Sequence, residues 1–239
     1  MRAGRPDPPA AADAVADEIG FARRLVRRVG GRLVVAFACI ALPLWLFGEL
    51  AEDVIEGEPF GFDEPLLRLA HAASGPEADA VFLALSAVGF GWGVIPVDIA
   101  LVLGLSLRRR FREATFAALA LGGSALLNIV AKHSFRRDRP ALWESIAPES
   151  TYSFPSGHAM GSATLACTLV ALAWHTRLRA PALVLAIPFV AGVGLSRVYL
   201  GVHYPSDIVA GWTAALAWTI AVYFAVYRRG QRPWGRRRG

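Results

Sequence analysis

Residues 155–174 read PSGHAMGSATLACTLVALAW. A short polar turn is followed at once by a mostly apolar run, and a helix that crosses a bilayer needs about 20 such residues. The polar turn falls where an extended loop would enter this helix, and a helix N-terminus exposes unpaired N–H groups. We therefore predict a membrane-spanning helix over Gly157–Trp174 with a polar site at its beginning.

Five further apolar runs have a similar length: Leu33–Leu50, Leu85–Leu107, Ala114–Ala131, Pro181–Ser196 and Ile208–Tyr227. Hydrophobic residues make up 55% of the 239 residues and charged residues only 18%. The hydrophobic core of a soluble protein of this size does not need such long apolar runs. We predict an all-α, polytopic membrane helix bundle with six transmembrane helices. Gly89, Gly91 and Gly93 interrupt the second run, so the part before them is either an interfacial helix or a bent beginning of the span.

The distribution of arginine predicts how this bundle is oriented. With six spans, four arginine-rich segments fall on one side of the membrane: residues 23–32, 108–112, 177–179 and 228–238. The acidic stretch 49–79 falls on the other side. Because Lys and Arg are enriched in cytoplasmic segments, we expect both termini in the cytoplasm.

We expect three parts along the chain. Residues 1–30, rich in Ala, Pro and Asp, are typical of a disordered cytoplasmic tail. Residues 31–228 form the membrane domain, and residues 229–239 form a basic cytoplasmic tail. Within the membrane domain, residues 62–73 are predicted to form an amphipathic helix on the outer surface.

Composition also argues against other classes of protein. The net charge is +6, but the arginines cluster between apolar runs and no nucleic-acid-binding motif is present, so we expect no nucleic-acid partner. No Cys/His cluster has zinc-binding spacing, and we expect neither a metal nor a cofactor. Abundant alanine and arginine with a single lysine indicate a GC-rich, bacterial genome.

Three polar clusters interrupt this apolar chain: Lys132 to Arg139-Pro140, Pro155 to His158, and Ser196-Arg197 to His203 and Asp207. They fall in the predicted loops between spans three and four and between spans five and six. Both loops are extracytoplasmic in the six-span arrangement, so the clusters share one membrane face. Lys132 is the only lysine in the chain, which indicates a need for a compact ammonium.

The residue types in these clusters suit the binding of a phosphoryl group. A helix N-terminus binds anions, and Gly157 lets an anion approach the backbone closely. Lys132, Arg139 and Arg197 supply cations for the non-bridging oxygens, where charge develops in phosphoryl transfer. The hydroxyl of Ser156 adds a further donor. The alternative for the three cations is an ordinary solvated loop, but cations outside the membrane run against the positive-inside tendency.

The two histidines suit covalent catalysis. His203 and Asp207 are four residues apart, so Asp207 can accept a hydrogen bond from one imidazole nitrogen and leave the other free to attack. His158, when protonated, can donate to the departing oxygen as a general acid. Histidine itself is then the nucleophile in an arrangement that follows the logic of catalytic triads.

The pattern of Lys132-x6-Arg139-Pro140, Pro155-Ser156-Gly157-His158 and Ser196-Arg197-x5-His203-x3-Asp207 resembles the three-part signature of the type 2 phosphatidic acid phosphatase superfamily. All fixed positions are present in order. The resemblance implies a metal-independent phosphatase that forms a phosphohistidine. It implies His203 as nucleophile, Asp207 as its partner and His158 as acid, with the phosphate bound by Lys132, Arg139, Ser156, Gly157 and Arg197. Known members act on phosphatidate, prenyl diphosphates and other lipid phosphates.

The leading hypothesis is an integral membrane phosphatase that acts on a lipid phosphate at the outer membrane surface. Phosphatidate, phosphatidylglycerol phosphate and undecaprenyl diphosphate remain open as substrates, and no obligate protein partner is inferred. One alternative is a phosphotransferase that uses the same phosphohistidine. A transporter or lipid-binding protein is disfavoured, because its ionisable residues usually lie near the membrane midplane, and Asp98 is the one feature in its favour.

Other polar residues near the clusters stay at simpler interpretations. We interpret Arg136, Arg137 and Asp138 as a solvated loop rather than as contacts to a substrate headgroup. Asn128 is either an interhelical hydrogen bonder or part of the floor of the site.

Overall fold

The computed structural model describes residues 37–227 and 231–235, and every regular element in these ranges is a helix. Residues 37–56 are helical, and seven helices follow: α2 (Asp63–Ala72), α3 (Pro76–Val88), α4 (Val94–Leu107), α5 (Phe111–Phe135), α6 (Gly157–Ala173), α7 (Arg179–Tyr199) and α8 (Pro205–Val226). The predicted all-α bundle is confirmed. The proposed tail 1–30, the beginning of the first apolar run and most of the basic tail lie outside the described residues.

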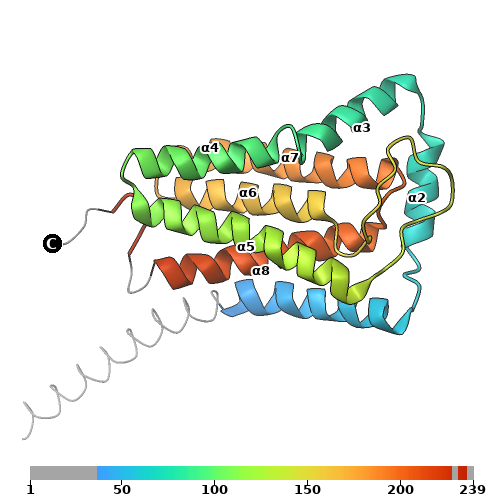
Figure 1. Ribbon diagram of the computed structural model, residues 1–239, viewed down its shortest axis with the longest axis horizontal. Helices are drawn as coiled ribbons and strands as arrows, with labels where there is room; N and C mark the ends of the chain where they lie inside the picture. Colours follow the sequence, from blue (N-terminus) through green and yellow to red (C-terminus); the bar gives the residue numbers. More distant parts are fainter. Residues whose placement is uncertain (1–36, 228–230, 236–239) are drawn as a thin grey trace, which may run out of the picture.

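The long helices lie side by side, with α6 in the middle of the bundle (Figure 1). α6 packs against α5, α7 and α8. Its buried face carries small side chains such as Ala159, Ser162 and Ala163, which let helices approach closely. Gly211 of α8 shows how close: a Cβ there would lie 2.9 Å from the carbonyl oxygen of Ser156. The packing of α8 therefore fixes the beginning of α6.

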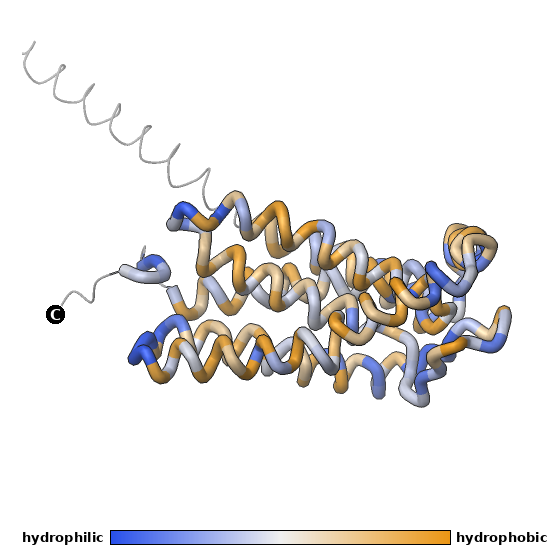
Figure 2. Tube along the Cα trace, turned by 90° about the horizontal axis from the view of Figure 1, so that it is seen from above, coloured by the Kyte–Doolittle hydropathy of each residue, from blue (hydrophilic) through white to orange (hydrophobic). Residues whose placement is uncertain are grey.

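The outer surface of the bundle is suited to lipid. Helices α5, α7 and α8 are long and apolar enough to cross a membrane, while α4 and α6 are shorter apolar helices. Apolar segments run along the bundle, and hydrophilic segments gather at its two ends (Figure 2). Large exposed apolar side chains occur on α5 and α7, among them Leu126, Ile129, Val184 and Ile187. That the bundle crosses the membrane six times stays a prediction.

The second apolar run is not one straight helix. It is divided between α3 and α4 by a tight connection at residues 89–93, where the Ile95 N–H donates to the carbonyl of Phe90 at 3.0 Å. A Cβ on Gly93 would lie 2.1 Å from the carbonyl oxygen of Val88, so the connection requires glycine. From this bend α3 diverges from the bundle toward α2 (Figure 1). The structure thus divides the second run into two helices, and the interfacial position of α3 stays a prediction.

The connections that carry the three polar clusters lie together at one end of the bundle. The loop 136–156 and the turn 200–204 meet there, and α2 lies across the same end (Figure 1). The predicted amphipathic helix is thus α2, and its Leu67 is fully buried against Ala159, Val198 and Ile208. The arginine-rich connection 108–110 lies at the opposite end.

Asp98 lies within α4, and its Oδ1 has no hydrogen-bond partner among the described residues.

Candidate active site

The turn between α7 and α8 carries His203. The chain reverses at Gly201, whose φ of +68° is a left-handed conformation that favours glycine. A Cβ at this position would also lie 2.7 Å from the Trp143 ring. Pro205 then begins α8, at a position where its missing N–H costs nothing. The backbone of this short turn therefore fixes where the imidazole lies.

Asp207 lies in the first turn of α8, and its carboxylate is fully buried. Its Oδ2 accepts hydrogen bonds from the Tyr204 N–H at 2.9 Å and from the Ser153 hydroxyl at 2.5 Å. The same oxygen lies 3.4 Å from Nδ1 of His203. The four-residue spacing across the beginning of α8 thus brings the imidazole and the carboxylate together.

Arg139 faces the other imidazole nitrogen, with its Nη1 3.1 Å from Nε2 of His203. Because arginine can only donate hydrogen bonds, Nε2 is the acceptor, and the ring proton lies on Nδ1 toward Asp207. Burial lowers the pKa of His203 to about 4, with Arg139 acting in the same direction and Asp207 opposing it. The imidazole is therefore neutral near pH 7. A neutral imidazole that presents Nε2 is a competent nucleophile.

The loop 136–156 holds Arg139 in this position. The Arg139 Nε–H donates to the carbonyl of Thr151 at 2.6 Å, and Nη1 donates to the carbonyl of Val202 at 2.6 Å. Both acceptors are backbone groups, so the direction of the guanidinium depends on the course of the chain. Arg139 is thus a preorganised cation beside His203.

Ser156 is the N-cap of α6, and it is fully buried. Its hydroxyl accepts from the Ala159 N–H at 3.5 Å, and its own N–H donates to the carbonyl of Asp207 at 3.1 Å. The hydroxyl proton is not used by the cap, so it can be donated to an anion. The cap also ties the beginning of α6 to the beginning of α8.

Lys132 lies in the last turn of α5 and reaches across to the loop before α6. Its Nζ donates to the carbonyl of Tyr152. Gly157 lies beside its stem: a Cβ there would lie 3.9 Å from Cε of Lys132 and 3.0 Å from Oδ1 of Asn128. Asn128 donates to the carbonyl of Pro155 at 3.1 Å. Asn128 therefore ties α5 to this loop, and the absence of a side chain at Gly157 leaves room beside the lysine.

Arg197 approaches from the last turn of α7 and is only 2% exposed. Its Nη1 donates to the hydroxyl of Ser86 on α3, and its Nη2 donates to Glu149. Its Nε lacks a hydrogen-bond partner within the described part of the chain. A buried guanidinium N–H without an acceptor is costly, so an anion at this position would be bound favourably.

His158, the second residue of α6, faces the same place. Its ring lies against Phe90 at the bend between α3 and α4, with the ring centroids 4.8 Å apart. Its Nδ1 lies 3.8 Å from Oε1 of Glu149. The structure therefore brings together all eight residues predicted from the three motifs: Lys132, Arg139, Ser156, Gly157, His158, Arg197, His203 and Asp207.

Glu149 is a site residue that sequence reasoning missed. Its carboxylate forms ion pairs with Arg139, at 2.7 Å, and with Arg197. It also lies 3.9 Å from Nε2 of His203. The residue stands in an irregular loop outside the three motifs, and its sequence neighbours carry no pattern that would have indicated this contact.

The interpretation of Arg137 as a solvated loop residue was wrong. Its Nη1 lies 2.6 Å from Oδ1 of Asp207, and its Nη2 lies 3.0 Å from Oδ2 of Asp63 in α2. The guanidinium also lies over the Tyr204 ring, 4.1 Å from its centroid. The physical reason is that a buried carboxylate requires a counter-charge. Its neighbours Arg136 and Asp138 are exposed, as expected.

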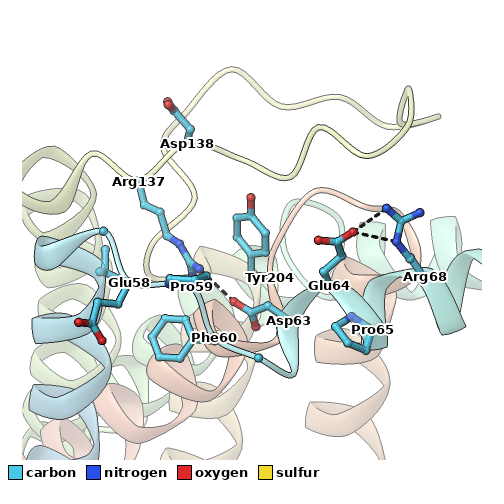
Figure 3. A pocket seen from close by; sticks show the side chains of 13 residues that line it. Glu58, Pro59, Phe60, Asp63, Glu64, Pro65, Arg68, Arg137, Asp138 and Tyr204 are labelled. Carbon is cyan, nitrogen blue, oxygen red and sulfur yellow. Dashed lines mark hydrogen bonds and ion pairs between the residues drawn. The ribbon is translucent and has the colours of Figure 1, made fainter.

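An open pocket of about 780 Å³ borders this network (Figure 3). Arg137 and Asp63 point toward one another in its wall, beside Phe60 and Tyr204. Asp63 also accepts from the Ser206 N–H at 2.8 Å. The network thus joins α2 to the beginning of α8.

Comparison with known proteins agrees with this architecture. Residues 113–231 match the PAP2 superfamily, and this range includes all eight predicted site residues. The chain is 29% identical to phosphatidylglycerophosphatase B from Bacillus subtilis over 162 aligned residues. These residues make up 64% of this chain and 78% of the relative. It is 29% identical over 183 residues to an undecaprenyl-diphosphatase from Sulfolobus acidocaldarius, covering 72% and 83%. It is 36% identical over 124 residues to a decaprenylphosphoryl-5-phosphoribose phosphatase from Mycobacterium tuberculosis, covering 51% and 63%.

Solved structures give the same result. The crystal structure of a transmembrane PAP2-type phosphatidylglycerolphosphate phosphatase from Bacillus subtilis matches 80% of this chain and 98% of its own, with a TM-score of 0.69 and 25% identity. The crystal structure of LpxE from Aquifex aeolicus matches 68% of this chain and 95% of its own, with a TM-score of 0.57 and 25% identity. The chain belongs to the PAP2 superfamily.

Proposed function

We propose that the protein is an integral membrane phosphatase that hydrolyses a lipid phosphate monoester or diphosphate through a phosphohistidine on His203. The observation that carries this proposal is the orientation of His203. Its Nδ1 faces the buried carboxylate of Asp207, while its Nε2 faces Arg139. A nucleophile therefore lies where the cations required by a phosphoryl group converge.

In the first half-reaction, Nε2 of His203 attacks phosphorus, and the bond from phosphorus to the leaving oxygen breaks. His158 donates a proton to that oxygen, so the lipid alcohol or lipid phosphate leaves in its protonated form. Asp207 holds the Nδ1 proton and stabilises the positive charge that develops on the ring. Lys132, Arg139 and Arg197 bind the non-bridging oxygens.

In the second half-reaction, water attacks the phosphohistidine. His158 accepts a proton from this water, the bond between phosphorus and Nε2 breaks, and inorganic phosphate is released. His203 returns to its neutral form and His158 to its protonated form. The positive charge in this scheme comes from side chains of the chain itself, so no divalent metal is needed.

The proposed substrate class rests on the relatives and on the location of the site. The names of the relatives describe phosphatases of phosphatidylglycerophosphate, undecaprenyl diphosphate and decaprenylphosphoryl-5-phosphoribose. What these molecules share is a terminal phosphate on a lipid carrier. The loops that carry the site lie at one end of the bundle (Figure 1), and the bundle itself is mostly apolar (Figure 2). A headgroup would reach the site there while the tail remains in the bilayer.

We propose that this end faces the outside of the cell and that the bundle has six spans. Arg108, Arg109, Arg110 and Arg112 belong to the connection and helix beginning at the opposite end. Arginine-rich connections are typical of the cytoplasmic side. The membrane is then both the location of the protein and the source of its substrate.

The test is phosphate release by the detergent-purified protein in EDTA, with phosphatidate, phosphatidylglycerol phosphate and undecaprenyl diphosphate as substrates. We expect release by the wild type, no release by His203→Ala, and wild-type release by His175→Ala, whose side chain is exposed outside the site. Acid-labile radioactive phosphate trapped on the wild type should be absent from His203→Ala. Loss of lipid phosphate without release of inorganic phosphate would contradict hydrolysis and indicate transfer to another acceptor.

A further inference from the structure

The centre of the candidate active site is occupied by a carboxylate of the chain itself. Glu149 lies in the irregular loop between α5 and α6, and each of its two carboxylate oxygens contacts a different arginine. Oε1 pairs with Arg197, and Oε2 lies 2.7 Å from Nη2 of Arg139. Oε1 lies 3.8 Å from Nδ1 of His158, and Oε2 lies 3.9 Å from Nε2 of His203. Two arginines and both histidines therefore surround this one group.

These four side chains are the ones that the proposed mechanism directs at the phosphoryl group. A carboxylate and a phosphoryl group present the same feature to arginine, a pair of anionic oxygens that match the guanidinium fork. Nε2 of His203 cannot reach phosphorus while a carboxylate lies between the two histidines. Two anions in the same buried volume would also repel each other strongly. Binding of a phosphoryl group therefore requires Glu149 to leave.

The two arginines do not depend on Glu149 for their positions. Arg139 also donates to the carbonyl groups of Thr151 and Val202, and Arg197 also donates to the hydroxyl of Ser86. The cations therefore remain in place when the carboxylate moves out. Glu149 itself is 27% exposed at its side chain, and its loop has no regular secondary structure, so a path toward solvent is available.

We propose that Glu149 is a displaceable internal ligand, which occupies the phosphate position in the resting enzyme and competes with inorganic phosphate for it after each turnover. This inference rests on the proposed function, because it assumes that the site binds phosphate. In this scheme Glu149 compensates the positive charges of Arg139 and Arg197 between turnovers. Its return to the site weakens the binding of the product and so promotes product release.

The charge on Glu149 is maintained by its surroundings. Burial alone would raise the pKa of the carboxyl group, but the guanidinium groups of Arg197 and Arg139 hold this pKa below its usual range. The group is therefore an anion throughout the neutral range, as a competitor of phosphate must be.

The experiment measures anion affinity directly, without a lipid substrate. Inorganic phosphate and orthovanadate are titrated calorimetrically into detergent-purified wild type, Glu149→Gln and Glu144→Gln. Glu144 is an exposed carboxylate of the same loop with no ion pair among the described residues, so its variant controls for the change in charge. We expect Glu149→Gln to bind both anions about tenfold more tightly or better, since it replaces one charged competitor, and Glu144→Gln to match the wild type.

The outcomes separate this inference from the proposed function. Equal or weaker binding by Glu149→Gln, with clear binding by the wild type, overturns the role of Glu149 and leaves the phosphate site intact. Failure of the wild type and of Glu149→Gln to bind either anion overturns the phosphate site and this inference with it. If Glu149→Gln does not fold, Glu149→Asp keeps the charge but is one methylene too short to pair with both arginines. It should bind phosphate more tightly than the wild type, and unchanged affinity overturns the inference.

Discussion

Arg137 and Asp207 form an ion pair at the edge of the candidate active site, with Nη1 2.6 Å from Oδ1. Arg137 thus contacts Oδ1 of Asp207, whereas Nδ1 of His203 lies beside Oδ2. One carboxylate thus faces a cation on one side and the imidazole on the other. The same guanidinium also forms an ion pair with Asp63 of α2. The orientation of His203 therefore depends on a helix that lies across the end of the bundle.

The first prediction concerns this arginine. Arg137→Ala leaves two buried carboxylates without a counter-charge, and breaking such a pair costs about 3 kcal/mol or more. We expect a lower unfolding midpoint and a lower kcat, measured by thermal unfolding in detergent and by phosphate release. Arg136→Ala, in the neighbouring exposed position, should behave like the wild type. Equal effects of the two variants would contradict a specific role for Arg137.

The second prediction concerns the orientation of the imidazole. Asp207→Asn removes the charge that holds the Nδ1 proton of His203, and the corresponding change in serine proteases lowers kcat by about 10⁴. We expect a folded protein with a loss of kcat of similar size and a much smaller change in KM. Kinetics at saturating substrate measure this, together with circular dichroism to verify the helical fold. Activity near that of the wild type would exclude Asp207 from the mechanism.

The third prediction concerns pH. The pKa of His203 is lowered to about 4 by burial and by Arg139, and only the neutral ring can attack. The neutral form therefore persists as the pH falls from 7 to 5, and it is lost as the pH passes through about 4. We expect the acid limb of kcat/KM that arises from His203 to lie near pH 4, measured with return to pH 7 to show that loss is reversible. A His203 limb near 6.5, identified by histidine NMR, would argue against the buried neutral imidazole.

The fourth prediction concerns the contact between α6 and α8. In Gly211→Ala, the new methyl group would lie 2.9 Å from the Ser156 carbonyl and 3.1 Å from the Met160 nitrogen. These are backbone atoms, so the beginning of α6 must shift, and overpacking of this kind costs about 1–3 kcal/mol. We expect lower stability and a loss of activity, because α6 carries His158.

Gly161→Ala is the matched control for this variant. Its new methyl group would meet only the Val94 side chain, at the ordinary contact distance of 3.8 Å. Stability and phosphate release should remain close to those of the wild type. If both alanine variants retained full activity, the close approach of α6 and α8 would not be needed to position the site.

Much of the site could be predicted from sequence because its residues lie in short motifs at the ends of apolar runs. His203 and Asp207 are four residues apart at the beginning of a helix, and that local spacing is sufficient to bring them together. Charge distribution predicted that the distant clusters share one membrane face, without any knowledge of helix packing. Apolar runs, local spacing and charge distribution were sufficient to predict the helix bundle and the gathering of the motif residues at one of its ends.

The contacts that sequence reasoning missed are those made across the fold. Arg137 pairs with Asp63, 74 residues before it, and only the orientation of α2 brings the two together. Glu149 lies in an irregular loop, where no periodicity indicates which way a side chain points. The division of the second apolar run depends on the close approach of Gly93 to Val88, which hydropathy alone does not reveal.

The range that matches the superfamily begins at residue 113, yet two polar contacts to the site come from before it. α2 contributes Asp63 to Arg137, and α3 contributes Ser86 to Arg197. In this first half of the chain, α2 and α3 therefore stabilise the site through these two contacts. A chimaera that exchanged this half for that of another family member, in order to change lipid preference, would have to preserve an acceptor at each of these two positions.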